Sequence, residues 1–323
     1  MAAFLPHDLG SPVWLTLLLL AELAGGYALQ KEEPALWAKI FAWAGMASAT
    51  LAAHLLALKE PAGFRMLALI AALFLGMKAV VGVSARAAGE KALTLARWSI
   101  FTLFWAGMRP VLFSDHPIAG KPWKRMALQG LGCALVGALL MLAAGPLWRS
   151  TGSLFLVTVF FFIGSSLLVH YGLFTLGAAF WKARGFNCEP LFRNPLTVEN
   201  LTDFWGKYWN LAYREMIALA VYRPLKGKLG PGLALFLAFA LSGLFHEVAI
   251  SVPVRGGFGL PLLYFLLQGI LVGGEKLGAE QGLVVRGIWG RIWTFFWLIA
   301  PLPILFHGPF LRGIIWPLMG GAR

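Results

Sequence analysis

The sequence predicts an all-α membrane protein, a polytopic bundle of about eight or nine transmembrane helices in a single domain over residues 1–323. Its composition supports this, because 59% of the residues are hydrophobic and only 13% are charged. A soluble domain carries about 25% charged residues, whereas a chain surrounded by lipid can turn apolar side chains outward. A soluble globular protein is therefore excluded.

Apolar windows of spanning length recur along the whole chain, since a helix needs about 20 residues to cross a bilayer. We divide the chain into N-terminal helices over 1–90, a core that carries the polar motifs over 91–252, and C-terminal helices over 253–323. The predicted spans are Pro12–Leu29, Ala35–Leu58, Phe64–Ala85, Met126–Trp148, Ser153–Trp181, Leu229–Val252, Gly259–Leu277 and Arg286–Phe306.

The segment Lys91–Phe113 is a further candidate span. Arg97, Arg109 and Pro110 interrupt it, so it is either a ninth span or an interfacial or re-entrant segment. The orientation of the N-terminus depends on which of the two it is.

Small residues recur at every fourth position in the window Met126–Trp148, at Gly130, Ala134 and Ala138. This spacing puts them on one face of a helix and lets a neighbouring helix approach closely in lipid. The pattern predicts close helix packing and says nothing of function.

The net charge is +13, and the main break in hydrophobicity is Lys182–Lys228, which holds eight basic and four acidic residues. By the positive-inside rule this region faces the cytoplasm. The shorter basic loop with His116, Lys121, Lys124 and Arg125 is two spans away, so both lie on one side. We expect a multi-pass protein of a bacterial inner membrane, in contact with membrane lipids. No basic run or soluble domain is available to bind nucleic acid.

Within this region Asn200 is a predicted N-cap for a helix that starts at Leu201, with Asp203 as an acid in its first turn. A continuous helix would put Asp203, Lys207, Asn210 and Arg214 on one stripe. The remaining side chains are strongly aromatic, which is typical of an element at the lipid–water boundary. Spacing alone favours a plain interfacial anchor helix, and nothing in the stripe by itself identifies a reaction.

The window Leu229–Val252 is apolar except for Ser242, His246 and Glu247. Ionisable side chains at membrane depth are costly and usually face the protein interior with a paired or functional role. Ser242 lies one turn before His246 on the same face, whereas Glu247 projects about 100° away. His246 is either a buried histidine that links helices, a member of a proton relay with Glu247, or a catalytic base.

Several common sites are excluded by spacing. No second histidine follows His246 by four residues, and no G-x-S-x-G, Walker A or G-x-G-x-x-G motif occurs. Six scattered histidines with few nearby acids do not form a metal site. The two cysteines, Cys133 and Cys188, are too few for a disulfide framework.

The polar elements resemble the membrane-bound O-acyltransferase superfamily, and its wax synthase-like branch in particular. That branch shows an F-W-G-basic-x-W-N element and, about 35 residues later, an S-G-x-x-H-E element. The matching residues here are Phe204-Trp205-Gly206-Lys207-Tyr208-Trp209-Asn210 and Ser242-Gly243-Leu244-Phe245-His246-Glu247. An H-x-G element is matched at His170-Tyr171-Gly172, followed by Phe180-Trp181-Lys182-Ala183-Arg184-Gly185.

Two elements depart from related patterns. In Trp105-Ala106-Gly107-Met108-Arg109-Pro110, Ala106 replaces the proline of a W-P-G-M-x-P element of that branch. Diacylglycerol and sterol acyltransferases carry F-Y-x-D-W-W-N, from which this chain departs at Trp205, Lys207 and Tyr208. The wax synthase-like branch is therefore the better match.

The resemblance implies transfer of an acyl group from acyl-CoA, as co-substrate, to a hydroxyl of a hydrophobic alcohol in an internal tunnel, with no metal or other cofactor. It makes His246 the general base and Asn210 its polar partner. Support residues are Phe204, Trp205, Trp209, Ser242 and Glu247, and candidates for the coenzyme A phosphates are Lys207, Arg214 and Arg223. The alternatives are a lipid or small-molecule transporter with a His246–Glu247 relay and a non-catalytic structural relative. The acceptor alcohol, the acyl length and the oligomeric state stay open.

Overall fold

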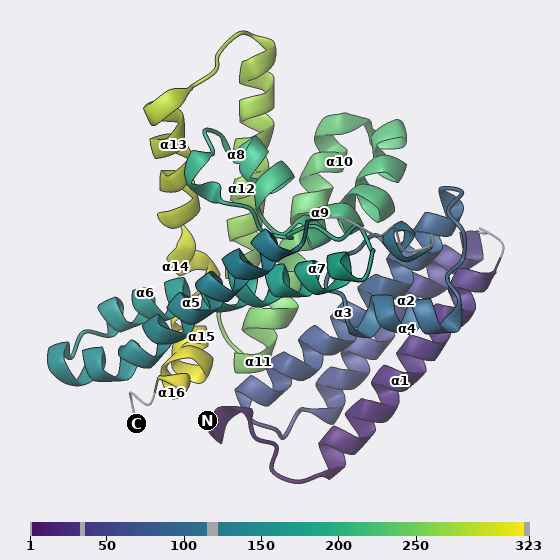
Figure 1. Cartoon of the computed structure of the whole chain (residues 1–323), viewed down its shortest axis with the longest axis horizontal. Coiled ribbons are helices and arrows are strands. Elements are labelled where there is room, and N and C mark those ends of the chain that lie inside the picture. Colours follow the sequence, from purple (N-terminus) through teal and green to yellow (C-terminus); the bar gives the residue numbers. More distant parts are fainter. Residues whose placement is uncertain (1, 33–35, 115–121, 320–323) are drawn as a thin grey trace.

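The computed structural model describes residues 2–32, 36–114 and 122–319, and all regular structure in these ranges is helical (Figure 1). Within them, eight helical stretches are long and apolar enough to cross a membrane, and they coincide with the predicted spans. The prediction of an all-α polytopic bundle is confirmed. The beginning of the Ala35–Leu58 window and the loop residues His116 and Lys121 lie outside the described ranges.

The N-terminal part contains three long helices, and α3 packs against both of the others. Close contact is possible because small residues lie where the helices cross: a Cβ on Gly76 would be 2.3 Å from Cγ of Met46, and one on Gly26 would be 2.8 Å from the Trp98 ring. The helices are α1 (Gly10–Lys31), α2 (Leu36–Leu56) and α3 (Ala62–Ala87), preceded by the short η1 (Ala2–Phe4).

The segment Lys91–Phe113 is not a ninth span. It forms a nine-residue helix, α4 (Leu95–Leu103), and a short 3-10 turn, η2 (Pro110–Phe113). Trp98 and Phe101 of α4 are 1% and 0% exposed, so the segment packs into the protein. The helix ends at Leu103, well short of spanning length, and Pro110 begins the separate turn η2.

The next two spans form a hairpin that extends from the rest of the molecule (Figure 1). Its elements are α5 (Lys124–Thr151), α6 (Leu154–Ser165), the π-helical η3 (Ser166–Leu173) and α7 (Phe174–Ala183). The prediction of close packing on α5 is confirmed at Gly130 and Ala134, which approach Gly172. Gly137 provides a further close approach, because its hypothetical Cβ would lie 2.4 Å from the backbone of Leu168.

The remaining helices surround the predicted motifs. The predicted span Leu229–Val252 corresponds to the second part of the helical stretch Leu211–Val254, which is broken at Gly230, where φ is 80° and ψ is 164° and Pro231 follows. The elements before and within it are η4 (Pro195–Thr197), α8 (Leu201–Asp203), the π-helical η5 (Phe204–Tyr208), α9 (Leu211–Ile217), the π-helical η6 (Ala218–Tyr222), α10 (Arg223–His246), the π-helical η7 (Glu247–Ser251) and α11 (Val252–Val254).

The C-terminal part packs through α12 against α10 and returns toward the N-terminal end, where α16 contacts η1. Its elements are α12 (Leu260–Glu280), α13 (Gly287–Ile299), α14 (Leu302–Leu305), α15 (Gly308–Phe310), the π-helical η8 (Leu311–Ile315) and α16 (Trp316–Leu318).

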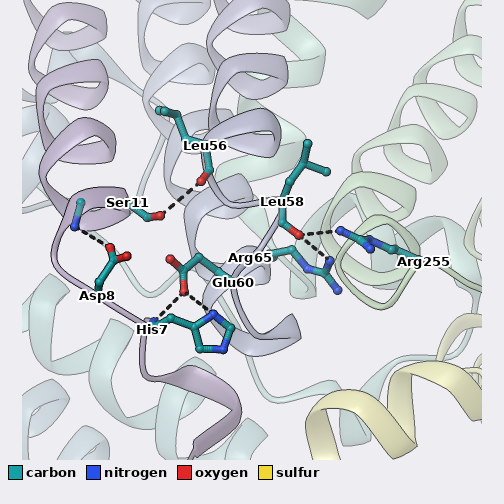
Figure 2. Close-up of polar contacts among 9 residues, drawn as sticks. His7, Asp8, Ser11, Leu56, Leu58, Glu60, Arg65 and Arg255 are labelled. Atoms are coloured by element: carbon teal, nitrogen blue, oxygen red, sulfur yellow. Dashed lines mark hydrogen bonds and ion pairs between the residues drawn. The ribbon is translucent and has the colours of Figure 1, made fainter.

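Polar contacts fasten these parts together at the end of the bundle that holds the N-terminus (Figure 2). The buried Glu60 accepts a hydrogen bond of 2.8 Å from the backbone N–H of His7. Arg65 and Arg255 both donate to the carbonyl oxygen of Leu58, and Arg65 also donates to that of Pro253. Side-chain donors thus satisfy the carbonyl oxygen of Leu58 in the α2–α3 turn and that of Pro253 in α11 (Val252–Val254).

Candidate active site

The element that begins at Leu201 is held at its start by two side chains. Asn200 accepts a hydrogen bond of 2.6 Å from the backbone N–H of Asp203, which confirms the predicted N-cap. Glu275 of α12 accepts hydrogen bonds from the backbone N–H groups of Leu201 and Thr202, at 2.9 and 2.8 Å. The hydroxyl of Thr202 and the indole N–H of Trp293 also donate to Glu275. This carboxylate therefore positions the whole element against α12.

The prediction of one continuous helix with four polar residues on a single stripe is wrong. The helix ends at Tyr208, and Asn210 has a left-handed backbone conformation with φ 44° and ψ 60°. Asn tolerates this conformation better than most residues, which is why the chain can turn here. Lys207 still pairs with Asp203 at 2.7 Å, but Asn210 and Arg214 belong to the next helix.

Asn210 is the N-cap of α9. Its Oδ1 accepts a hydrogen bond of 3.2 Å from the backbone N–H of Tyr213. Since a backbone N–H can only donate, this contact assigns the oxygen of the amide to the cap. The Nδ2 group makes no hydrogen bond within the described ranges, so it is available to donate to a substrate.

His246 lies at the end of α10 with a defined tautomer. Its Nδ1 is 2.7 Å from the carbonyl oxygen of Ser242, an atom that can only accept, so Nδ1 carries the proton. Nε2 consequently has a free lone pair. The imidazole packs against the ring of Phe265 with centroids 4.2 Å apart, and this contact from α12 orients it.

Glu247 turns away from His246, as predicted, and binds the start of α12. Its Oε1 accepts a hydrogen bond of 3.1 Å from the backbone N–H of Leu262. At the same crossing a Cβ on Gly243 would be only 2.8 Å from Cα of Leu262, so α10 and α12 touch through the backbone. Glu247 thereby fixes the helix that carries Phe265.

Aromatic contacts join the Phe204–Asn210 element to His246 on one side. The indole of Trp205 lies 5.7 Å from the ring of Phe265 and donates to Oε1 of Gln268 at 3.1 Å. Gln268 is 0% exposed. Phe265 thus lies between Trp205 and His246.

The same element reaches His170 on its other side through Trp209. The indole of Trp209 stacks on Phe204 at 5.5 Å and meets His170 edge-on at 5.4 Å. Backbone hydrogen bonds from Arg193 to Tyr208 and from Leu211 to Leu191, at 2.8 and 2.9 Å, hold the intervening chain. The structure therefore brings together three motifs that are far apart in sequence: His170–Gly172, Phe204–Asn210 and Ser242–Glu247.

The link between Asn210 and His246 is indirect. Tyr213, one turn after Asn210, packs against Phe245 at 6.1 Å, which brings α9 against α10 beside His246. No hydrogen bond joins Asn210 to His246 among the described residues. Their predicted shared cavity stays a prediction.

The predicted phosphate-binding cations lie on exposed surfaces, and Lys207 and Arg214 have their side chains in solvent. Arg223 lines a cavity of about 260 Å³ between α2, α3 and η6, to which Lys39 also contributes. Two positive charges at one cavity suit an anionic group.

Three further residues at the site were not anticipated. Gln268 and Glu275 lie in the apolar window of α12, and they carry the same signal as His246, a polar residue at membrane depth. His307 is 3% exposed, with Nε2 3.2 Å from the Ser251 hydroxyl and Nδ1 accepting from the backbone N–H of Phe310. Burial lowers the pKa of His307, while the nearby Glu247 acts in the opposite direction.

Three of the motif-bearing stretches share π-helical backbone. The π-helical segment η3 contains His170, and η5 contains Trp205. The π-helical segment η7 begins directly after His246. Such segments are uncommon and often occur at functional sites. Sequence patterns with a period of 3.6 residues do not reveal them.

Comparison with known proteins supports the resemblance. A model of the "Membrane bound O-acyl transferase family" matches residues 188–267, which include the Phe204–Asn210 and Ser242–Glu247 elements. The long-chain-alcohol O-fatty-acyltransferase of Simmondsia chinensis is 29% identical over 205 residues, covering 57% of this chain and 54% of that protein.

Two proteins of Arabidopsis thaliana show similar but shorter matches. The probable long-chain-alcohol O-fatty-acyltransferase 9 is 28% identical over 144 residues, 40% of this chain and 42% of its own. Acyl-CoA–sterol O-acyltransferase 1 is 40% identical over 86 residues, 24% of this chain and 25% of its own. The chain thus spans about half the length of these relatives or less. Because they are plant proteins, they do not support the expected bacterial inner membrane.

Proposed function

We propose that this chain, which is similar to membrane-bound O-acyltransferases of the wax synthase-like branch, transfers an acyl group from an acyl-CoA thioester to the hydroxyl of a hydrophobic alcohol. The observation that carries the proposal is the tautomer of His246. Its Nδ1 donates to Ser242, so Nε2 is free to take a proton. An alcohol is a weak nucleophile near neutral pH and needs such a base.

The reaction has two steps. Nε2 of His246 takes the hydroxyl proton while the alcohol oxygen bonds to the thioester carbonyl carbon, whose π electrons move to the carbonyl oxygen. The intermediate then collapses: the C–S bond breaks, the coenzyme A sulfur leaves as thiolate, and the imidazolium returns the proton to it. The products are an ester and free coenzyme A, and no other reactant is needed.

Asn210 supplies the donor for the negative oxygen of the intermediate. Its oxygen is held by the backbone N–H of Tyr213, which leaves Nδ2 to donate. A preorganised donor of this kind typically contributes a factor of about 10² to 10³ in rate. The left-handed backbone at Asn210 supports this role, because an unfavourable conformation is retained where the turn serves a site.

The topology that we propose puts Lys182–Lys228 in the cytoplasm, where acyl-CoA is dissolved. Three spans precede α4 and two follow it before this region. Since α4 does not cross, the N-terminus and the contacts of His7 with Glu60 lie on the opposite side. Arg223 and Lys39 would then face the coenzyme A phosphates.

The decisive experiment offers radiolabelled acyl-CoA and a panel of long-chain alcohols and sterols to the purified protein. Transfer should occur with the wild type, vanish in His246→Ala and fall about a hundredfold in Asn210→Ala. His54→Ala is the control, because it removes a histidine from another apolar helix, α2. Equal transfer by His246→Ala and the wild type would refute the mechanism.

A proton-coupled transporter is the second candidate function. The observation that favours it is Glu247, whose Oε2 is buried and makes no hydrogen bond among the described residues. A free carboxyl oxygen inside the membrane is what a proton relay needs in order to accept and pass on a proton. Uptake of a lipid or small molecule into liposomes, without acyl transfer, would support this function instead.

A further inference from the structure

A cavity of about 360 Å³ lies between α1, α2 and α3. This volume is within the range of about 300 to 1,000 Å³ that is usual for small-molecule sites. Its lining is almost entirely apolar and consists mostly of glycine and alanine, with Glu22 on α1 and Ser48 on α2 as the polar residues.

Glu22 is the unusual group in this cavity. Both of its carboxyl oxygens are buried, and neither has a hydrogen-bond partner within the described part of the chain. It lies near the middle of the 22-residue α1, far from either end of the span. A buried acid without a partner is costly, and at membrane depth it marks a functional site by default.

The cavity opens toward the lipid. Helix α1 is at the outside of the bundle, with only 6% of its apolar window buried. Phe41, which lines the cavity from α2, is 61% exposed. In a membrane such side chains face hydrocarbon, so a ligand would enter laterally from the bilayer.

This cavity is separate from the candidate active site. Gly76 and Ala79 face it from α3. The same helix also contacts η6 and η7, which precede and follow α10. Helix α3 therefore stands between Glu22 and the helix that carries His246.

We propose that this cavity is a second lipid-binding site, which takes a hydrophobic alcohol, and that the Glu22 side chain turns from its buried position into the cavity to bind the hydroxyl group. A hydroxyl both donates and accepts, so it satisfies a carboxyl group without bringing a charge into the membrane. An ammonium group would have to leave water entirely, at a much larger cost. The site does not depend on the acyl transfer proposed above.

The test is photolabelling of the purified protein in lipid nanodiscs. The probes are hexadecanol with a diazirine on its chain, a diazirine-bearing sterol, and diazirine-bearing alkane and amine analogues of the same length as the hexadecanol. We expect one of the two hydroxyl probes to label peptides of α1, α2 or α3. Labelling by hexadecanol would indicate a linear alcohol, and labelling by the sterol would indicate a ring-shaped one. The alkane and the amine should label these peptides about tenfold less.

Two variants test the cavity itself. Glu22→Leu removes the polar group and should lower labelling about tenfold, whereas Glu22→Gln keeps a donor and an acceptor and should stay within about threefold. Gly45→Leu fills the cavity, since a Cβ on Gly45 meets nothing within 4 Å, and should also lower labelling about tenfold. Gly132→Leu on α5 is equally unobstructed, lies outside the cavity and should change nothing.

The proposal fails if the alkane or the amine labels as strongly as the alcohol, or if Gly45→Leu leaves labelling unchanged. Thermal unfolding of each variant shows whether it is folded. If Glu22→Leu does not fold, the labelling of Gly45→Leu and Glu22→Gln tests the proposal in its place. Acyl transfer is measured on the same preparations, so loss of the second site and loss of the catalytic reaction are distinguishable.

Discussion

The imidazole of His246 on α10 packs against the ring of Phe265 on α12, with centroids 4.2 Å apart and planes inclined by 33°. Phe265 in turn contacts Trp205, so one aromatic ring connects the two motifs. The orientation of the proposed base is therefore set by a residue outside both motifs.

Replacing this ring should impair the reaction more than the fold. In Phe265→Leu a smaller apolar side chain remains, so we expect a loss of about 1 to 2 kcal/mol in the free energy of unfolding. The imidazole loses its support, and kcat should fall roughly tenfold while the KM for acyl-CoA is unchanged. Leu263→Ala, on the exposed side of the same helix, should leave kcat unchanged. An unaltered kcat in Phe265→Leu would show that Phe265 does not position His246.

Glu275→Gln should detach the start of α8. The carboxylate accepts four hydrogen bonds through two oxygens, and an amide has only one oxygen to offer. We expect a loss of about 2 to 3 kcal/mol in the free energy of unfolding, together with reduced transfer. The matched control is Glu280→Gln, at the exposed end of the same helix, which should be neutral. Equal stability of the two variants, measured by thermal unfolding, would contradict this role.

Lys78 should be essential for the turn after α4. Its Nζ is fully buried and donates to the carbonyl oxygens of Phe101, Trp105 and Gly107 at 2.9, 2.7 and 2.6 Å. Lys78→Met leaves these buried oxygens without a donor and should cost about 3 to 5 kcal/mol. The exposed Lys91→Met serves as control in denaturant unfolding. A loss below 1 kcal/mol, about that of a surface ion pair, would show that the turn does not need this side chain.

Arg223→Gln should weaken the use of acyl-CoA selectively. Arg223 is exposed, so solvent screening limits its contribution to about 1 kcal/mol, or roughly three- to fivefold in the KM for acyl-CoA. The KM for the alcohol should be unchanged, and Lys226→Gln, which does not line the cavity with Lys39, should have a smaller effect. Equal increases in both KM values would indicate a general defect in place of a lost phosphate contact.

Cys188 should be unreactive in the native protein. It is 0% exposed, and burial raises the pKa of its thiol to about 12. The thiol thus stays protonated from pH 7 to 9, and maleimide should modify it only after denaturation. Because the pKa is raised in the folded state, this group stabilises the fold below about pH 8.5, the pKa of an unfolded thiol, and loses that contribution as pH rises further. Rapid labelling of native Cys133→Ser at pH 8 would contradict this prediction.

Much of the fold could be predicted because membrane insertion is governed by local composition. The predicted windows coincide with the observed spanning helices, since each span must satisfy its own backbone in lipid. The Asn200 cap could also be predicted, because it is a local hydrogen bond between residues only three positions apart. The segment Lys91–Phe113 could not be assigned, because its burial depends on neighbours such as Lys78.

The sequence by itself determined the membrane class, the spans, the cap at Asn200 and the choice of His246 and Asn210 as polar residues worth testing. Only the tertiary structure decided that Phe265 packs on His246 and contacts Trp205, and that Glu275 holds the start of α8. The physical reason is range. Hydropathy and capping act within one helix, whereas a ring contact or a hydrogen bond between helices exists only after side chains from distant positions have packed against each other.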